Sequence, residues 1–253
     1  MKKLTKKQIV QEQEYSFPYH YADLKSEEDR YLNFIEYLNR LKFVRKSLGN
    51  IKSKKILDAG CGDGRLCYEL KKEKADIVGI DFSERAISFA KAFNPDVKFM
   101  IGDIRKLKLA YKFDSIILME TLEHIPPKDI PSLLDGLYRI LGSNGKLIIT
   151  VPSINLPLSD KHYQHFTEES LRKTLEPYFG IDPIFGYSKK GFKRKVFNNL
   201  IRFGLLLFPL KNRIPSIYRF YKFINNYFVK NLMIGKPEEC YGLIAICSKK
   251  AKK

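Results

Sequence analysis

From residue 54 onward the sequence alternates short apolar runs with amphipathic stretches, and this alternation constrains the fold more than any other feature. Apolar runs separated by helical patterns are typical of parallel strands whose sheet is covered by helices on both faces. The sequence therefore predicts a doubly wound α/β fold. Strands are expected at 55–59, 76–81, 97–101, 113–119 and 146–151, with helices at 64–74, 84–94, 128–141 and 168–177 and two closing strands at 181–185 and 241–247.

The ends of the chain differ from this central pattern. Residues 1–25 are polar and then aromatic, so we expect an irregular arm there. A helix should begin near Ser26, whose hydroxyl can cap the first turn, and carry an apolar stripe through Leu48. We thus divide the chain into an arm and helix that form a lid or cap (1–50), a core (51–188), a basic aromatic helical insert (189–237), and a last strand with a lysine-rich tail (238–253).

The charge is strongly positive, at +18 with 46 Lys and Arg against 28 Asp and Glu. Between Asp182 and Glu238 there are twelve Lys and Arg and no acidic residue. Such an excess indicates an anionic partner, which includes nucleic acid, a membrane surface or a phosphorylated compound. The four cysteines lack CxxC spacing and the N-terminus lacks a secretory pattern, so a reducing cytoplasm is expected.

A glycine-rich turn follows the first predicted strand in the segment Asp58-Ala59-Gly60-Cys61-Gly62-Asp63-Gly64. Glycines there let the backbone turn tightly and let a ligand approach without a Cβ in the way. The third glycine of a dinucleotide fingerprint would fall at Arg65, which argues against NAD. A carboxylate, Asp58, also precedes the turn inside the strand.

Two more carboxylates stand at the ends of the next strands. Asp81, followed by Phe82, can accept both hydroxyls of a ribose, because its two oxygens match a cis-diol. Asp103 is suited to accept from an adenine amino group, and the backbone N–H of Ile104 can donate to the ring. Because parallel strands end at one sheet edge, these groups are expected around one cleft.

Together with FDSIILMETLEHI, the segments ILDAGCGDG, IVGIDFS and IGDI resemble the class I S-adenosylmethionine-dependent methyltransferases over about residues 50–180. The resemblance implies a seven-stranded Rossmann-like sheet with an antiparallel last strand and S-adenosyl-L-methionine as cofactor. It places the methionine moiety at the glycine turn and the sulfonium near Met119 and Glu120. The implied cofactor-binding residues are Asp58, Gly60, Cys61, Gly62, Gly64, Asp81, Phe82, Asp103, Ile104, Met119 and Glu120.

Three histidines follow predicted strands at the same sheet edge. A hydroxyl acceptor benefits from a base near neutral pH, and we expect His124, His162 and His165 to supply it. His20, in the aromatic arm, is a weaker candidate. Glu120, Glu123 and His124 form a segment similar to the metal-binding Glu-x-x-Glu-His of small-RNA 2′-O-methyltransferases and ubiquinone-biosynthesis O-methyltransferases. Short segments of this kind also occur without metal, so no metal is assigned.

The insert at 189–237 mixes lysines with leucines and aromatic residues, but its apolar run is shorter than the ~20 residues that span a bilayer. It can lie on an anionic membrane surface, cap the acceptor pocket, or bind a single nucleic-acid strand. The leucines favour lipid over nucleic acid. We therefore predict methyl transfer to an oxygen of a small-molecule or lipid-linked acceptor, in the cytoplasm or at the inner membrane surface, with the arm and the insert roofing the pocket. An RNA methyltransferase and a non-catalytic binding module are the alternatives.

Overall fold

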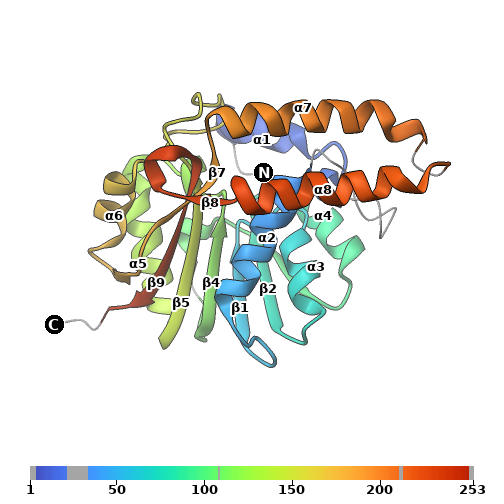
Figure 1. Cartoon of the computed structure of the whole chain (residues 1–253). Helices are drawn as coiled ribbons and strands as arrows, with labels where there is room; N and C mark the ends of the chain where they lie inside the picture. The colour runs from blue at the N-terminus through green and yellow to red at the C-terminus, as the bar shows by residue number, and fades with distance from the viewer. Residues whose placement is uncertain (1–3, 22–33, 108, 211–212, 251–253) are drawn as a thin grey trace.

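The computed structural model describes residues 4–21, 34–107, 109–210 and 213–250. Within these residues the strands form one nine-stranded sheet in the order β3-β2-β1-β4-β5-β9-β7-β8, with β6 also paired to β9 (Figure 1). The strands are β1 (Lys55–Ala59), β2 (Asp76–Asp81), β3 (Lys98–Ile101), β4 (Phe113–Met119), β5 (Leu141–Pro152), β6 (Phe179–Ile181), β7 (Phe185–Lys189), β8 (Ile234–Gly235) and β9 (Cys240–Lys249).

The central strands β3, β2, β1, β4 and β5 are parallel, whereas β9 runs antiparallel to β5, with Ile148 opposite Ile246. The sequence pattern predicts the mostly parallel α/β sheet, and the family resemblance implies its antiparallel last strand. Because β1 to β5 run in one direction, their carboxyl ends lie along one edge, where ligands bind in open α/β sheets.

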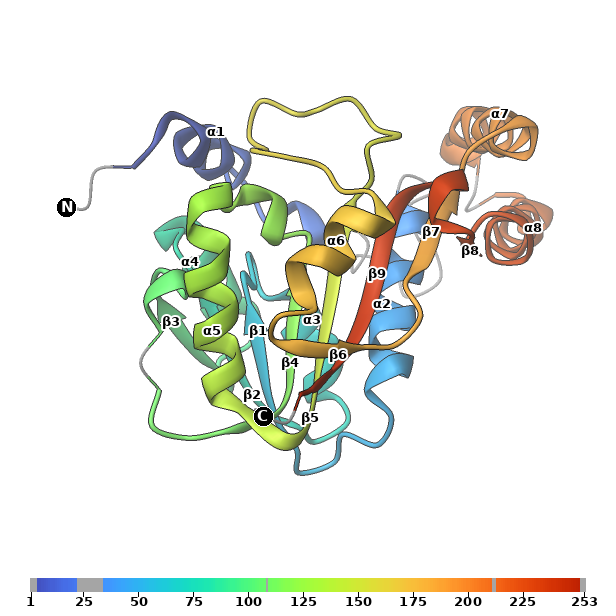
Figure 2. The same ribbon diagram turned by 90° about the vertical axis from the view of Figure 1, so that its left-hand side faces the viewer.

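Helices cover both faces of the sheet (Figures 1 and 2). One face is packed by α2, α3 and α4, which bury residues such as Leu41 and Leu70 against β1. The other face is packed by α5 and α6, which bury Leu137 and Leu171. These helices are α2 (Ile35–Leu48), α3 (Arg65–Lys71), α4 (Glu84–Phe93), α5 (Ile130–Ile140) and α6 (Glu168–Leu175); the 3-10 turns are η1 (Tyr19–Tyr21), η3 (Ile104–Lys106), η4 (Leu122–His124), η5 (Pro127–Asp129), η6 (Phe208–Leu210) and η7 (Pro237–Glu239).

The sheet has more strands beside β9 than the sequence predicts. The run 181–185 is not one strand, because it joins the end of β6 to the start of β7, and both of these pair with β9. The two-residue β8 then pairs with β7. These short additions bring the described strands to nine, where seven were predicted.

The N-terminal arm is not irregular throughout, since residues Lys6–Glu14 form helix α1. Thr5 caps it through a reciprocal pair of hydrogen bonds with Gln8, which stabilises the first turn. This capping box is visible in the sequence, but the stretch lacks the apolar stripe on which a helix prediction depends. The predicted helix start at Ser26 lies outside the described residues, and α2 is described from Ile35 onward.

The insert is helical, as predicted. Helices α7 (Phe192–Leu207) and α8 (Pro215–Asn231) lie side by side along one side of the molecule (Figures 1 and 2). They share a small apolar cluster with α2, in which Phe197 and Phe228 pack near Ile35. No helix in the described residues has the length and apolar character needed to cross a bilayer.

Candidate active site

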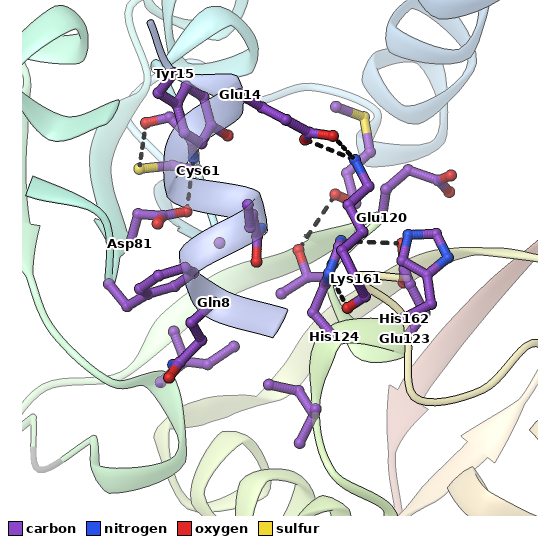
Figure 3. Close-up of a pocket in the computed structure, with 18 of the residues that line it drawn as sticks. Gln8, Glu14, Tyr15, Cys61, Asp81, Glu120, Glu123, His124, Lys161 and His162 are labelled. Atoms are coloured by element: carbon purple, nitrogen blue, oxygen red, sulfur yellow. Dashed lines mark hydrogen bonds and ion pairs between the residues drawn. The ribbon is translucent and has the colours of Figure 1, made fainter. Parts of the chain in front are cut away.

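A cavity of about 370 Å³ lies at the carboxyl edge of the sheet, beneath α1 (Figure 3). A volume of this size is at the lower end of the range for pockets that hold one drug-sized ligand. Its floor comes from the ends of β1, β2 and β4, and its roof from α1 and from residues 161–163. The predicted residues on its wall are Asp58, Gly60, Cys61, Gly62, Asp81, Phe82, Asp103, Ile104, Met119, Glu120, His124 and His162.

Two positions in the glycine turn tolerate only glycine. Gly60 and Gly62 have φ of 87° and 53°, and a Cβ at either position would collide with Thr121 or Tyr15. Gly64 differs, because it does not line the cavity. It caps α3 with φ of 80°, and a Cβ there would meet Ala90, so Gly64 allows α3 to pack closely against α4.

Asp58 and Asp81 are almost fully buried beside this turn. Burial raises the pKa of Asp58 to about 7, although the Cys67 thiol donates to its Oδ2 at 3.4 Å. Burial also raises the pKa of Asp81 to about 6, against the backbone N–H groups of Gly62 and Ser83, which donate at 2.9 Å each. Asp81 therefore both shapes the turn and presents a carboxylate to the cavity.

Asp103 also lines the cavity, and its carboxylate is hydrogen-bonded to Arg105. The Arg105 guanidinium donates to both Asp103 oxygens, at 2.8 and 2.7 Å, and the Arg105 backbone N–H donates to Oδ1 at 3.1 Å. Phe82 and Ile104 lie on the wall beside it. The three strand-end carboxylates therefore border one cleft, as the sequence predicts.

Glu120, directly after β4, lies in a partly buried polar network. Its backbone has φ of 53°, an uncommon conformation for a residue other than glycine. The carboxylate accepts from Thr150 Oγ1 at 2.9 Å and Tyr187 OH at 2.8 Å, and lies 3.3 Å from Arg40 Nη1. The buried Nε of Arg40, which also lines the cavity, has no hydrogen-bond partner within the described residues.

The predicted histidines do not all lie in one place. His124 and His162 line the cavity with ring centroids 4.6 Å apart, whereas His165 is not among the lining residues and contacts His162 instead, at 2.8 Å from Nε2 to Nδ1. Burial lowers the pKa of His124 to about 4. Burial and the neighbouring His124 lower the pKa of His162 to about 3. Both rings are therefore neutral near pH 7.

Glu123 is the most unusual acid in the cavity. It is 1% exposed, and neither carboxylate oxygen has a hydrogen-bond partner within the described residues. Burial and then Glu120 raise its pKa well above the usual range. Ligand atoms of Glu123, His124 and His162 lie within 4.8 Å of one another, and one carboxylate with two neutral imidazoles fits a divalent cation.

The roof of the cavity comes from the arm and from residues 161–163, not from the insert. Residues of α1 and its end line the cavity, whereas the described residues of the insert do not, so the insert is not a roof. His20 also lies on the wall, with its Nδ1 3.0 Å from Asp63 Oδ1. The lining residues that sequence reasoning did not assign to the site include Gln8, Glu14, Tyr15, Tyr37, Arg40, Thr121, Lys161 and Tyr163.

A parallel sheet with a glycine turn and three acids along one edge defines a class I S-adenosylmethionine-dependent methyltransferase. The model of the methyltransferase-domain family matches residues 50–198, so the chain belongs to that family. It is similar to ubiquinone biosynthesis O-methyltransferases of Alkalilimnicola ehrlichii (31% identity, covering 46% of this chain and 49% of that protein) and Coxiella burnetii (34%, covering 46% and 50%). The chain thus spans about half the length of these relatives.

Among solved structures, the fold is similar to the N-methyltransferase NodS from Bradyrhizobium japonicum in complex with S-adenosyl-L-homocysteine. The TM-score is 0.63 at 14% identity, over 98% of this chain and 100% of that one. At this identity the likeness speaks for the fold alone.

Proposed function

We propose that this chain transfers the methyl group of S-adenosylmethionine to an oxygen of a small-molecule or lipid-linked acceptor. The observation that carries the proposal is the neutral imidazole of His124 in the same cavity as the three strand-end carboxylates. The names of the ubiquinone biosynthesis relatives support an oxygen acceptor of small size. They give no support to an RNA acceptor or to a non-catalytic module.

The cofactor would lie along the strand ends. Asp81 accepts from the ribose hydroxyls and the glycine turn surrounds the methionine part, whose carboxylate finds a cation in Arg40. Phe82 and Ile104 would hold the adenine, and Asp103, together with Arg105, would be available to its amino group. Met119 and Glu120 would lie at the sulfonium end.

Transfer is an in-line displacement in which the acceptor oxygen forms a bond to the methyl carbon as the carbon–sulfur bond breaks. The hydroxyl proton passes to His124, and the cofactor leaves as neutral S-adenosylhomocysteine. Burial keeps His124 unprotonated near pH 7, but its pKa of about 4 is below the near-neutral value that the sequence predicts and makes the ring a weaker base. His162 packs against His124 and orients it, and His165 acts through His162.

The test is a transfer assay with S-adenosylmethionine labelled in the methyl group. The acceptor panel contains phenols and catechols with and without isoprenoid chains, amines, and single-stranded RNA. His124→Ala should lower kcat by about 10²–10⁴-fold with little change in cofactor affinity. His165→Ala is the matched comparison and should have a smaller effect, because His165 does not line the cavity. Wild-type kcat in His124→Ala would contradict the role of the base.

The unpartnered Glu123 supports a second form of the same reaction, with a divalent cation held by Glu123, His124 and His162. When bound, such a cation would lower the pKa of an acceptor hydroxyl. The check is calorimetric titration of chelator-treated protein with Mg²⁺, Mn²⁺ and Zn²⁺. Glu123→Gln should abolish binding, and Glu169→Gln, at an exposed position in the first turn of α6, is the control. Absence of heat with all three ions would exclude this form.

The α7–α8 insert, by this proposal, makes peripheral contact with an anionic membrane. Phe203 stacks edge-on against Phe220 at 5.7 Å and Phe220 lies 6.3 Å from Phe223, which gives an aromatic row across both helices. Phe203 and Phe223 are 54% and 52% exposed, and Leu206 is 76% exposed. Exposed apolar side chains among lysines suit the headgroup region of a bilayer, where each cation contributes about 1 kcal/mol.

Vesicle sedimentation tests this contact. The full chain should bind vesicles that contain phosphatidylglycerol and not those of phosphatidylcholine alone, and Phe203→Ser with Leu206→Ser should lower binding about tenfold. Ile101→Ser, at the exposed β3 on the other edge of the sheet, is the control. Unchanged binding by the double variant would contradict a role of this row.

A further inference from the structure

Helix α1 covers the cavity without burying any of its own nine residues. The side chains of Gln8, Gln11 and Glu14 line the cavity, whereas Ile9 and Val10 are 45% and 39% exposed. Its polar face is therefore the inner one, which is the reverse of a helix held by apolar burial. A helix this short is marginal by itself in water. Apart from the buried Tyr15 at its end, polar contacts hold it in place.

Two side chains on α1 reach the same short segment, residues 160–163. Lys7 Nζ donates to the carbonyls of Asp160 and His162, at 2.7 and 2.6 Å. Glu14 accepts from Lys161 Nζ at 2.7 and 2.9 Å. These contacts join α1 to the loop after β5 on the far side of the cavity.

The same loop segment contacts the base. The Lys161 carbonyl lies 3.2 Å from His124 Nδ1, and the Tyr163 N–H donates to the Glu123 carbonyl at 2.8 Å. Because a carbonyl only accepts, His124 must carry its proton on Nδ1 to make this bond. The lone pair then resides on Nε2, which is the nitrogen left to accept a proton.

We infer that α1 is a latch, and that Lys7 and Glu14 are positioning residues which fix the tautomer of His124 through residues 160–163. With the latch closed, the Lys161 carbonyl is held where it selects the Nδ1–H form. With the latch open, the cavity is uncovered and the loop is free to shift. Closure over the ligands and orientation of the base are thus one event. The inference rests on the proposed function only for the role of His124 as base.

The experiment is ¹⁵N NMR of the histidine rings in the full chain at pH 7.5 with chelator present, with His124 assigned from His124→Gln. The Nδ1–H tautomer should dominate in the wild type. Lys7→Met and Glu14→Gln should each raise the Nε2–H fraction several-fold. They should also speed exchange of the Tyr163 amide roughly tenfold, the scale of one charge-assisted hydrogen bond. Lys7→Arg should restore both signals.

The control is Lys6→Met, the exposed neighbour on the outer side of α1, which should change neither signal. An unchanged tautomer in both Lys7→Met and Glu14→Gln, or an equal change in Lys6→Met, would overturn the inference. The measurement needs no acceptor, so it is decided separately from the proposed function. Full turnover in His124→Ala would defeat the base assignment and leave the tautomer result standing.

Discussion

The glycine-turn wall of the cavity and the roof across from it differ in how they are held. Gly60, Asp58 and Asp81 follow or belong to β1 and β2, in which every residue after the first is buried. The roof consists of α1 and residues 160–163, which side-chain hydrogen bonds and one ion pair connect. Burial holds the first wall, whereas the second is held by polar contacts and by the buried Tyr15 at the end of α1. The comparison teaches that the wall proposed to bind the cofactor belongs to the core, whereas the roof is attached to it by a few side chains.

The largest effect is expected at Asp81. Asp81→Ala should weaken S-adenosylmethionine binding by about 100-fold, because it removes a paired acceptor with hydrogen bonds of about 1.5–3 kcal/mol. Asp76→Ala, at the exposed start of the same strand, is the control and should bind normally. Calorimetric titration measures both, and equal affinity for the two variants would show that the wall does not bind ribose.

Alanine substitutions at Gly60, in the turn, and at Gly136, in a helix, should change the free energy of unfolding in opposite directions. Gly60→Ala should lower the free energy of unfolding by about 1–3 kcal/mol, since a positive φ and Thr121 both oppose a Cβ. Gly136→Ala, inside α5 with open space around it, should raise that energy by about 0.5–1 kcal/mol. Urea denaturation of the wild type and the two variants measures both changes. A stable Gly60→Ala would mean that the turn is not tightly constrained.

The pKa of Asp81, about 6 in the free protein, predicts a pH dependence of cofactor binding. Ribose hydroxyls donate to the ionised carboxylate, so binding favours deprotonation and affinity should rise with pH through 6. Between pH 5 and pH 7 the gain is about tenfold for this one group. Titrations across this range should give a flatter profile for Asp81→Asn, and an identical profile would assign the dependence to another group.

The smallest effect is expected on the outer side of α1. Ile9→Gln should change the free energy of unfolding by less than about 0.5 kcal/mol, because the side chain is already in solvent. Ile87→Ala, in buried α4, should cost about 2–5 kcal/mol. Urea denaturation compares the two. A large loss in Ile9→Gln would show that α1 is held by more than its polar contacts.

The difference between the buried strand ends and the roof also explains which features of the site the sequence could predict. Strands β1, β2 and β4 begin and end where their apolar runs do, and three acids at strand ends must share an edge once the sheet is parallel. Arg40 and Tyr187 had no such signal, because their meeting with Glu120 depends on how α2 and β7 pack against the core. Which histidines reach the cavity depends on the path of a loop, and spacing alone could not separate His165 from His162.

The hydrogen bond from Tyr187 to Glu120 connects β7, the strand that leads to the surface helices, with the wall of the cavity. Tyr187 lies on β7, only a few residues before α7, so this one strand separates the insert helices from Glu120 on the cavity wall. A displacement of α7 would therefore be coupled through β7 to the position of the Glu120 carboxylate. If the insert docks on a membrane as proposed, the same strand would couple docking to the cavity.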